Sequence, residues 1–402
     1  MESYKKVYIP YGGYFSSPFS RWQGSMQNDN AISLGANTAR RWFLEKRGID
    51  PTVIDYLFFG STVAQKHWFV AHNWASALLT DDKKYVPGLF INQACSTSTT
   101  ILNLAAKDIE LGAYHVAFGM MADRCSNGPH TIWPDPLGPG AQPDREDWNM
   151  DNFDGNPKHR AAMVETAENV AKEIGDITKE ECDQVVLRRF DQFMEARSND
   201  RAFQKRYMFP PEVTVSRKKT KLLEEDEGWT PTTAEGLARL KPLRPEGVLS
   251  FGAQTFPADG NCGILITTKE RAKELSTDPK IEVQVISYGF ARVKPRFMPA
   301  APVPAAEMAL TTAGLKISDI KAVKTHNPFA VNDIAFSRRT GFDVMKMNNY
   351  GSSLIYGHPQ GPTAGRGVIE MIEELALLGG GYGLFTGCAA GDTSAALIVK
   401  VG

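Results

Sequence analysis

Apolar runs of strand length alternate with stretches of helical spacing along the first part of the chain. Strands are predicted at 7–13, 56–63, 88–95 and 115–121, and helices at 31–48 and 96–112. Strands that alternate with helices form sheets whose faces those helices cover, so this pattern favours an α/β fold. Strand and helix signals return after residue 247 in a similar order, which suggests an internal duplication.

A block of different composition separates the two α/β parts. It is rich in Pro, Asp, Trp and charged residues, and it contains a predicted long amphipathic helix near 161–197 and a basic run at 217–221. We interpret this block as an inserted loop domain. The chain then divides into an N-terminal half (1–121 and 247–270), the inserted domain (122–246) and a C-terminal half (271–402).

Length, charge and cysteine usage narrow the class of protein. The chain has 402 residues and a formal net charge of −1, so it has no global basic field that would attract nucleic acid or a membrane surface. The N-terminus lacks an apolar segment of signal-peptide length, and no run of about 18 apolar residues occurs, so we expect a cytoplasmic protein. The five cysteines are widely spaced without a CxxC motif, which predicts free thiols and no metal site.

Cys95 stands where a predicted buried strand meets the start of the helix at 96–112. Unpaired backbone N–H groups and the positive end of a helix favour a thiolate at such a place. A cysteine between apolar residues is nevertheless more often an inert part of the core. Position alone therefore leaves both interpretations open.

Three further segments carry groups that are typical of active sites. His358 lies in the turn YGHPQG, Cys388 lies among small residues in GCAAGD, and His326 and Asn327 lie in THNPF. A loop histidine can act as a base, a cysteine as an acid, and a polar side chain as an oxyanion donor. Each segment taken alone also fits an ordinary turn, hairpin or strand end.

The four segments together resemble the thiolase superfamily. Its members carry a nucleophilic cysteine that opens a helix, an Asn- or His-containing loop with Phe, a GHP turn and a C-terminal CxG motif. This chain has CSTS, HNPFA, GHPQG and CAAG in those places and in that order. The resemblance covers nearly the whole chain. It implies an α/β thiolase fold, with two duplicated βαβαβαββ halves in a five-layer α-β-α-β-α arrangement and an inserted loop domain.

The resemblance also implies an acyltransferase that cleaves a 3-oxoacyl-CoA with CoA, or runs the reverse condensation. His358 would take the proton of Cys95, the sulfur would attack the 3-oxo carbon, and Cys388 would act as the acid and base for the enolate and for CoA. His326 would stabilise one oxyanion and the amides of Cys95 and Ala390 the other. Asn327 and Gly391 would support these groups. CoA is then a substrate, no cofactor is bound permanently, and we expect at least a homodimer.

Contacts to CoA are predicted for a small set of polar residues. The set is Arg160, Arg217, Lys218, Lys219 and Thr255. Guanidinium and ammonium groups suit the phosphates of CoA. A solvated charged face is the ordinary explanation for such a run.

Several departures from common thiolases suggest an unusual substrate. His326 stands where degradative thiolases have Asn, and Ala390 replaces the glycine of CxG. Aromatic residues that could line a bulky pocket or simply pack are Trp68, Phe69, Trp74 and Trp133. A bulky aromatic substrate such as benzoylsuccinyl-CoA would use such a wall, with Arg21 or Arg124 for its carboxylate. Enzymes of that aromatic-degradation branch work with a small zinc-ribbon and OB-fold partner subunit.

Three alternative functions stay open for a chain with this sequence. The first is a condensing synthase of the hydroxymethylglutaryl-CoA or ketoacyl synthase type, against which Cys388 argues because these enzymes usually lack a second cysteine. The second is a lipid-transfer-type thiolase, which also has His at the position of His326. The third is a non-catalytic carrier with the same fold, against which the joint presence of Cys95, His358 and Cys388 argues.

Overall fold

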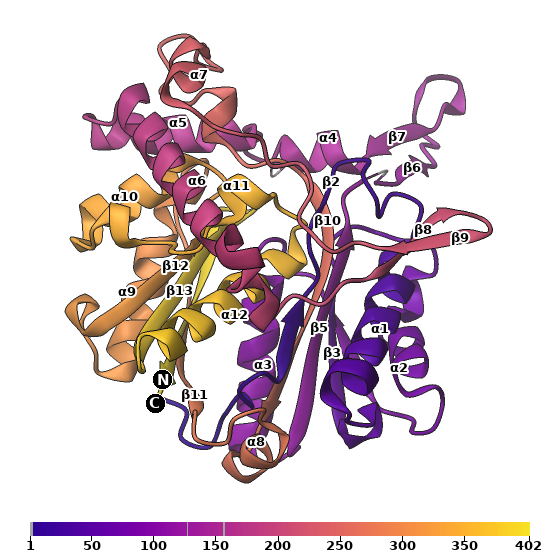
Figure 1. Ribbon diagram of the computed structural model, residues 1–402. Coiled ribbons are helices and arrows are strands. Elements are labelled where there is room, and N and C mark those ends of the chain that lie inside the picture. Colours follow the sequence, from indigo (N-terminus) through magenta and orange to yellow (C-terminus); the bar gives the residue numbers. More distant parts are fainter. Residues whose placement is uncertain (1–2, 127, 156) are drawn as a thin grey trace.

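The computed structural model describes residues 3–126, 128–155 and 157–402, and it contains two large β-sheets (Figure 1). The first sheet has the order β1-β10-β5-β3-β4, with β2 beside β10, and the second has the order β11-β14-β13-β12. The strands of the first are β1 (Tyr14–Ser16), β2 (Ser20–Arg21), β3 (Tyr56–Gly60), β4 (Gly88–Ile91), β5 (Val116–Arg124) and β10 (Ala258–Thr267). The strands of the second are β11 (Val283–Arg292), β12 (Ile320–His326), β13 (Gly381–Ala389) and β14 (Thr393–Val401).

Helices cover both faces of each sheet. The helices concerned are α1 (Ala31–Arg41), α2 (Ala71–Thr80), α3 (Thr97–Leu111), α9 (Pro302–Ala313), α10 (Ala330–Thr340) and α12 (Gly361–Leu377). Helices α1 and α2 pack on the outer face of the first sheet, α3 and α12 lie between the sheets, and α9 and α10 lie beyond the second (Figure 1). The expected five-layer α-β-α-β-α arrangement is therefore confirmed. Because α12 lies inside, Gly361 through Leu375 are all buried.

The two halves share one strand order, with a single difference. The first half runs β1, α1, β3, α2, β4, α3, β5, β10, which is the expected βαβαβαββ order. Among the described residues of the second half, no strand corresponds to β4. Asn348 lies there instead: its backbone N–H donates to Val323 O (2.9 Å), and its side-chain oxygen accepts from Thr325 N (2.7 Å). A left-handed φ of 59° at Asn348 prevents the chain from continuing as a strand.

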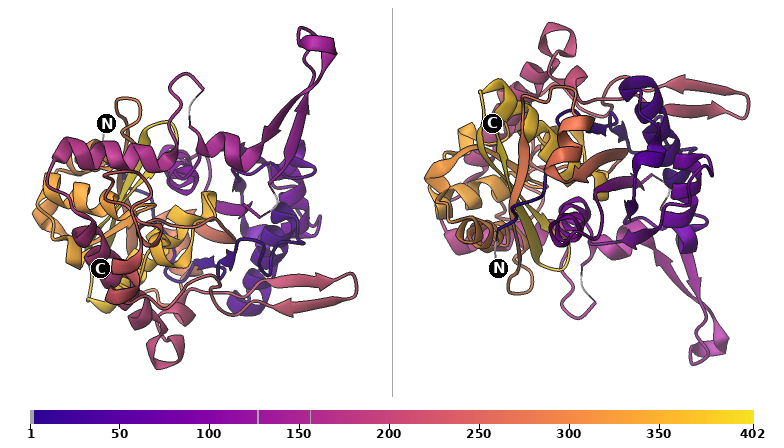
Figure 2. Two further views of the ribbon diagram at one scale, coloured as in Figure 1. Left: turned by 90° about the horizontal axis from the view of Figure 1, so that it is seen from above. Right: turned by 90° about the horizontal axis from the view of Figure 1, so that it is seen from below.

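The segment between β5 and β10 crosses one face and sends out two hairpins. The hairpins β6–β7 (His130–Trp133, Asp144–Asp147) and β8–β9 (Glu212–Ser216, Lys219–Leu222) project from the body (Figure 2). The helices of this segment are α4 (Trp148–Phe153), α5 (Met163–Ile174), α6 (Lys179–Arg201) and α7 (Ala234–Arg239). Two more short helices, α8 (Lys269–Leu275) and α11 (Ser353–Tyr356), follow later in the chain.

The prediction of one continuous helix near 161–197 is wrong. Gly175 adopts a left-handed φ of 93° and ends α5, and the Thr178 side chain caps α6 by accepting from Glu181 N (3.1 Å). Two helices therefore meet at a turn. No helix within the described ranges combines the length and the apolar character needed to cross a membrane.

Candidate active site

A cavity of about 440 Å³ gathers the four predicted catalytic side chains, Cys95, His326, His358 and Cys388. Cys95 lies in the turn just before α3 in the first half. The other three come from the second half: His326 ends β12, His358 precedes α12, and Cys388 lies in β13. Residues far apart in the sequence thus meet where the two halves face each other.

Cys95 lies on a tight turn between β4 and α3. Ala94 has a φ of 46°, a left-handed conformation that is strained for a residue with a Cβ. The turn is held by Thr97, whose hydroxyl donates to Ala94 O (2.7 Å) and accepts from Gln93 N (2.9 Å). Burial raises the pKa of the Cys95 thiol to about 12, and the backbone N–H groups of Ala390 and Cys95 act in the opposite direction. Cys95 is therefore a neutral thiol with two amides directed at its sulfur.

His358 is the nearest base to that thiol. Its Nε2 lies 3.1 Å from Cys95 Sγ, and its Nδ1 lies 2.6 Å from Thr363 Oγ1 in the first turn of α12. Burial lowers the pKa of His358 to about 3, so the imidazole is neutral. When Nδ1 carries the proton and donates to Thr363, the lone pair on Nε2 faces the sulfur. Gln360 adds a second contact, with Oε1 3.2 Å from Cys95 Sγ.

The His326 ring stacks on the His358 ring with 4.1 Å between centroids. Its Nδ1 lies 2.9 Å from Ser353 Oγ, while its buried Nε2 has no hydrogen-bond partner in the described part of the chain. Burial lowers the pKa of His326 well below its usual range, with the neighbouring His358 acting in the same direction. A neutral ring with one unused nitrogen therefore lies beside the nucleophile.

Cys388 faces the cavity with an amide partner. Asn332 Nδ2 donates to its Sγ at 3.2 Å. Burial raises the pKa of Cys388 well above its usual range, with the nearby Cys95 adding to this, while the bond from Asn332 acts in the opposite direction. Cys388 is therefore a neutral thiol that holds its proton, and the bond from Asn332 is the contact that favours its thiolate.

Of the predicted supporting residues, Ala390 lines the cavity and the other two lie behind it. Asn327 Nδ2 donates to Asp333 (2.7 Å), and its carbonyl oxygen accepts from Leu354 N (3.3 Å). This side chain fixes the loop that carries His326. Gly391 lies in the turn between β13 and β14 with a φ of 88°.

The rest of the cavity wall is apolar and aromatic. Its larger apolar members are Trp148, Phe153, Met163, Val164, Met298 and Phe329. No Lys, Arg, Asp or Glu occurs among the described residues that line it. The aromatic wall was predicted from other residues, and that assignment is wrong: of the described lining residues, none is Trp68, Phe69, Trp74 or Trp133. Phe69 is 95% exposed, and the Trp68 ring packs on Phe90 with 4.7 Å between centroids.

The predicted CoA contacts lie in different places. Thr255 lines the cavity, and its hydroxyl donates to Ser353 O (2.5 Å). Arg217, Lys218 and Lys219 lie at the exposed tip of the β8–β9 hairpin, and Arg160 is exposed in the loop before α5. The structure thus brings one of these five residues to the cavity.

Sequence analysis missed the residues that hold the catalytic side chains. Buried Asp123 accepts from Ser61 Oγ (2.8 Å), Thr62 N (2.7 Å) and Gly361 N (2.8 Å), which ties the end of β3 to the start of α12. Burial raises the pKa of Asp123 to about 6, although these donors act in the opposite direction. The available signal in the sequence was a carboxylate two residues after the predicted apolar strand at 115–121. Ser353, Gln360, Thr363 and Asn332 carried no such signal.

The nucleophile and the two imidazoles also resemble a set of metal ligands. One ligand atom from each of Cys95, His326 and His358 lies within 4.8 Å of the other two. Thiolate and neutral imidazole are the ligands that Zn²⁺ prefers. We therefore expect soft metal ions to bind this cluster and inhibit the protein, although no metal site was predicted from the sequence.

Comparisons with known proteins agree along the whole chain. The family model described as the thiolase N-terminal domain matches residues 15–270, and the thiolase C-terminal domain matches residues 279–401. The acetyl-CoA acetyltransferase of Escherichia coli is 29% identical over 94% of this chain and 95% of its own length. Beta-ketothiolase BktB of Cupriavidus necator is 27% identical over 94% and 95%. The crystal structure of the Bacillus anthracis acetyl-CoA acetyltransferase superimposes with a TM-score of 0.89 at 26% identity, covering all of both chains.

Proposed function

The chain belongs to the thiolase family and is an acyltransferase that acts on acyl-CoA, and from this premise we propose that Cys95 carries the acyl group between two half-reactions. The observation that supports this most directly is the 3.1 Å contact between Cys95 Sγ and His358 Nε2, with His326 and Cys388 on the same cavity. In this proposal Cys95 is the nucleophile and His358 the base, while Cys388 is the acid and His326 the oxyanion donor, and all four line the same cavity.

In the first step, His358 takes the proton of Cys95 as the sulfur adds to the 3-oxo carbon. The pKa of about 12 for Cys95 and of about 3 for His358 both oppose a thiolate–imidazolium ion pair before substrate binds. Proton transfer is therefore coupled to substrate, because the negative charge ends on the former ketone oxygen rather than on sulfur. His326 donates from Nε2 to that oxyanion when the Ser353 hydroxyl donates to its Nδ1.

In the second step, the oxyanion collapses to a thioester on Cys95 and the C2–C3 bond breaks. Cys388 gives its proton to C2 of the leaving enolate, and the CoA ester that contains C1 and C2 departs. The Cys388 thiolate then takes the thiol proton of an incoming CoA, whose sulfur attacks the acyl-enzyme. The amides of Cys95 and Ala390 hold this second oxyanion, and His358 returns its proton to the released Cys95.

For the acyl group we propose a neutral, bulky 3-oxoacyl chain, including aryl chains. The wall formed by Trp148, Phe153 and Phe329 favours planar apolar groups. A free carboxylate on the acyl group would find no cation among the described residues that line the cavity. Arg124, which was predicted for that role, already donates to Gln27 O (3.1 Å) and Asp29 O (2.6 Å). Benzoylacetyl-CoA therefore fits this wall better than the dicarboxylic benzoylsuccinyl-CoA, which was the earlier expectation.

We also propose a homodimer through the open edge of the first sheet. Strand β4 ends that sheet, and exposed apolar side chains surround it, namely Phe69, Val70, Tyr85 and Leu89. An unpaired strand edge with apolar neighbours is suited to pairing with a second copy. Sedimentation velocity of the wild type and of Leu89→Lys tests this, since the variant should shift toward monomer. The predicted small zinc-ribbon partner subunit stays a prediction.

Mass spectrometry of the intact protein and its peptides tests the nucleophile. Wild type incubated with a 3-oxoacyl-CoA should carry one acyl group on the Cys95 peptide. Cys95→Ser should not be labelled on the same timescale, and Cys182→Ser, which changes a buried cysteine in α6, should be labelled like wild type. Labelling of Cys95→Ser at the wild-type rate would remove Cys95 from the mechanism.

Direct competition between substrates tests the acyl group. Benzoylacetyl-CoA should be cleaved with a kcat/KM about tenfold higher than acetoacetyl-CoA, equivalent to about 1.4 kcal/mol of transition-state binding. Phe153→Ala should remove most of this advantage, because it takes one ring out of the wall. A preference for acetoacetyl-CoA in the wild type would assign these aromatic residues to packing alone.

A further inference from the structure

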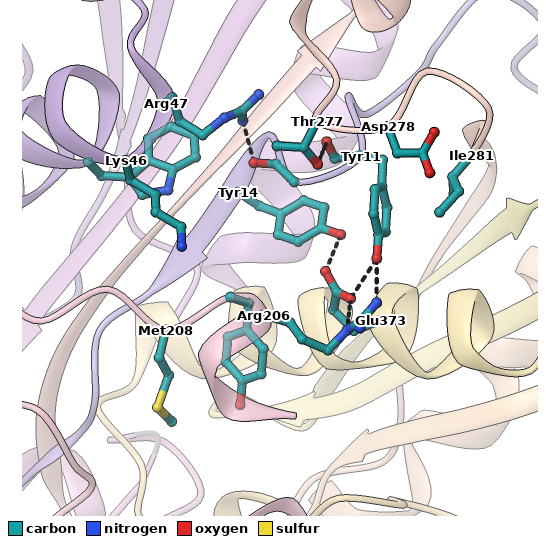
Figure 3. A pocket seen from close by; sticks show the side chains of 13 residues that line it. Tyr11, Tyr14, Lys46, Arg47, Arg206, Met208, Thr277, Asp278, Ile281 and Glu373 are labelled. Carbon is teal, nitrogen blue, oxygen red and sulfur yellow. Dashed lines mark hydrogen bonds and ion pairs between the residues drawn. The ribbon is translucent and has the colours of Figure 1, made fainter. Parts of the chain in front are cut away.

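A second cavity, of about 420 Å³, lies where the two halves and the inserted segment meet (Figure 3). It is bordered by the chain before β1, the π-helical turn η1 (Trp42–Arg47), the short 3-10 helix η5 (Gln204–Arg206), the loop after α8, and α12. It shares no described lining residue with the cavity around Cys95. Its volume is within the range of small-molecule sites.

The carboxylate inside this cavity is already fully engaged. Buried Glu373 accepts from Arg206 Nε (2.6 Å), Tyr11 OH (2.9 Å) and Tyr14 OH (2.7 Å). Arg206 donates a further bond to Tyr11 OH (2.6 Å). These four side chains form a closed network, so the negative charge of Glu373 is compensated from within.

Two other cations at the cavity, Arg47 and Lys46, have no carboxylate partner among the residues that the structure describes. The Arg47 guanidinium donates to two neutral acceptors, Gly12 O and Leu275 O, and lies over the Trp42 ring at 5.4 Å. Lys46 makes no hydrogen bond or ion pair with any residue that the structure describes. The second carboxylate in the lining, Asp278, accepts from Lys280 N (3.0 Å). The cavity therefore keeps an excess of positive charge.

Figure 3 shows where the side chains of the two cations, Arg47 and Lys46, point. Arg47 points to the Gly12 carbonyl, whereas Lys46 extends the other way, toward the space bounded by Tyr14 and Met208. The partly exposed Met208 thioether thus lies next to a free ammonium group, whereas the Tyr14 ring is only 2% exposed. Lys46 stands on a π-helical turn, a rare conformation that is often found at functional sites.

We propose that this cavity is a binding site for a small organic anion with an apolar body. Its carboxylate or phosphate oxygens pair with Lys46, and its apolar part packs against the partly exposed Met208. Carboxylate and phosphate share the chemistry of an anionic oxygen group, which is what an unpaired ammonium group recognises. The site does not depend on the thiolase reaction, because it contains none of the catalytic side chains.

Isothermal titration with three probes of similar shape tests the proposal. The probes are benzoate, phenyl phosphate and the neutral benzamide. The protein is first alkylated at Cys95 with iodoacetamide, so that probes are hindered from entering the active site. At least one of the two anions should bind about tenfold more tightly than benzamide, because only an anion pairs with Lys46. The stronger of the two anions identifies the carboxylate or the phosphate as the preferred group.

Variants locate the binding event. Lys46→Ala should weaken binding of the preferred anion about fivefold or more, and Lys46→Arg should retain it. Lys107→Ala, which removes an exposed lysine on α3, is the matched control and should bind like the parent. Equal affinity for benzamide and both anions, or unchanged affinity in Lys46→Ala, would overturn the proposal. Lys46 is exposed, so its replacement leaves the fold intact.

Discussion

Replacing Asp226 with Ala should destabilise the protein far more than breaking an exposed ion pair of the same length. Asp226 accepts two bonds from Arg366, at 2.7 and 2.9 Å, and both side chains are 0% exposed. It also accepts from Phe19 N at 2.8 Å. Arg366 pairs in addition with Glu370 (3.0 Å), which pairs with Lys324 (3.1 Å). Two cations and two carboxylates thus balance in the interior.

The magnitude follows from what Asp226→Ala leaves behind. The interior keeps two cations and one carboxylate, and Phe19 N loses its acceptor. Breaking one partner of a buried pair costs about 3–5 kcal/mol. Arg366 keeps Glu370, so we expect the lower end, about 3 kcal/mol. Glu165→Ala is the matched control: it breaks a 2.8 Å pair with Arg244 in which both side chains are 45% exposed, and should cost about 1 kcal/mol or less.

Urea unfolding followed by tryptophan fluorescence measures both variants. The free energy of unfolding should fall by about 3 kcal/mol in Asp226→Ala, with an unchanged slope against urea. Asp226→Asn should lie between this variant and the wild type, because it keeps the shape and one acceptor. A loss in Asp226→Ala no larger than that in Glu165→Ala would refute the reasoning, since burial is the difference between the two pairs.

Three further predictions concern the cavity around Cys95. Between pH 7.5 and 5, the free energy of unfolding in urea should fall by about 2 kcal/mol more in the wild type than in His358→Gln, because His358 takes up a proton near pH 6.5 in the unfolded chain but has a pKa of about 3 in the folded protein. Equal losses in the two proteins would contradict this. Cys388→Ala should lower kcat for thiolysis about 10²-fold or more while its Cys95 still reacts with iodoacetamide, and Asn332→Ala should lower kcat by less. Undiminished turnover in Cys388→Ala would exclude Cys388 as the acid. Cd²⁺ should inhibit thiolysis and give a sulfur-to-metal absorption band in the ultraviolet, and a chelator should reverse both effects. His326→Ala should require about tenfold more Cd²⁺ for the same inhibition, and unchanged inhibition in this variant would place the ion elsewhere.

The fold class was readable from the sequence because period and length separate its elements. Strands such as β3 and β5 are largely apolar and buried, and helices such as α3 show helical spacing with a Gly after the last turn. The break between α5 and α6 was missed because amphipathic spacing continues through Gly175. Its cap signals, Gly175 and Thr178, are nevertheless present in the sequence.

The catalytic side chains could be predicted from motifs, whereas the wall of the cavity could not. Cys95, His358 and Cys388 stand in short patterns that tie residue type to a local turn, and the structure places all three on one cavity. Their roles remain predictions. Trp148 and Phe153 reach the same cavity from the inserted segment, and nothing local to α4 indicates which part of the fold it covers. Such long-range placement depends on tertiary packing, so the aromatic candidates near residue 70 were chosen wrongly.

The shared strand order of the two halves means that the cavity needs both of them. Cys95 precedes α3 in one half, and His358 precedes α12 at the corresponding point of the other, with the two helices packed against each other between the sheets. Two equivalent places in the fold therefore face each other but carry different residues. One half carries the nucleophile and the other carries the nearest base, so neither half contains the pair by itself.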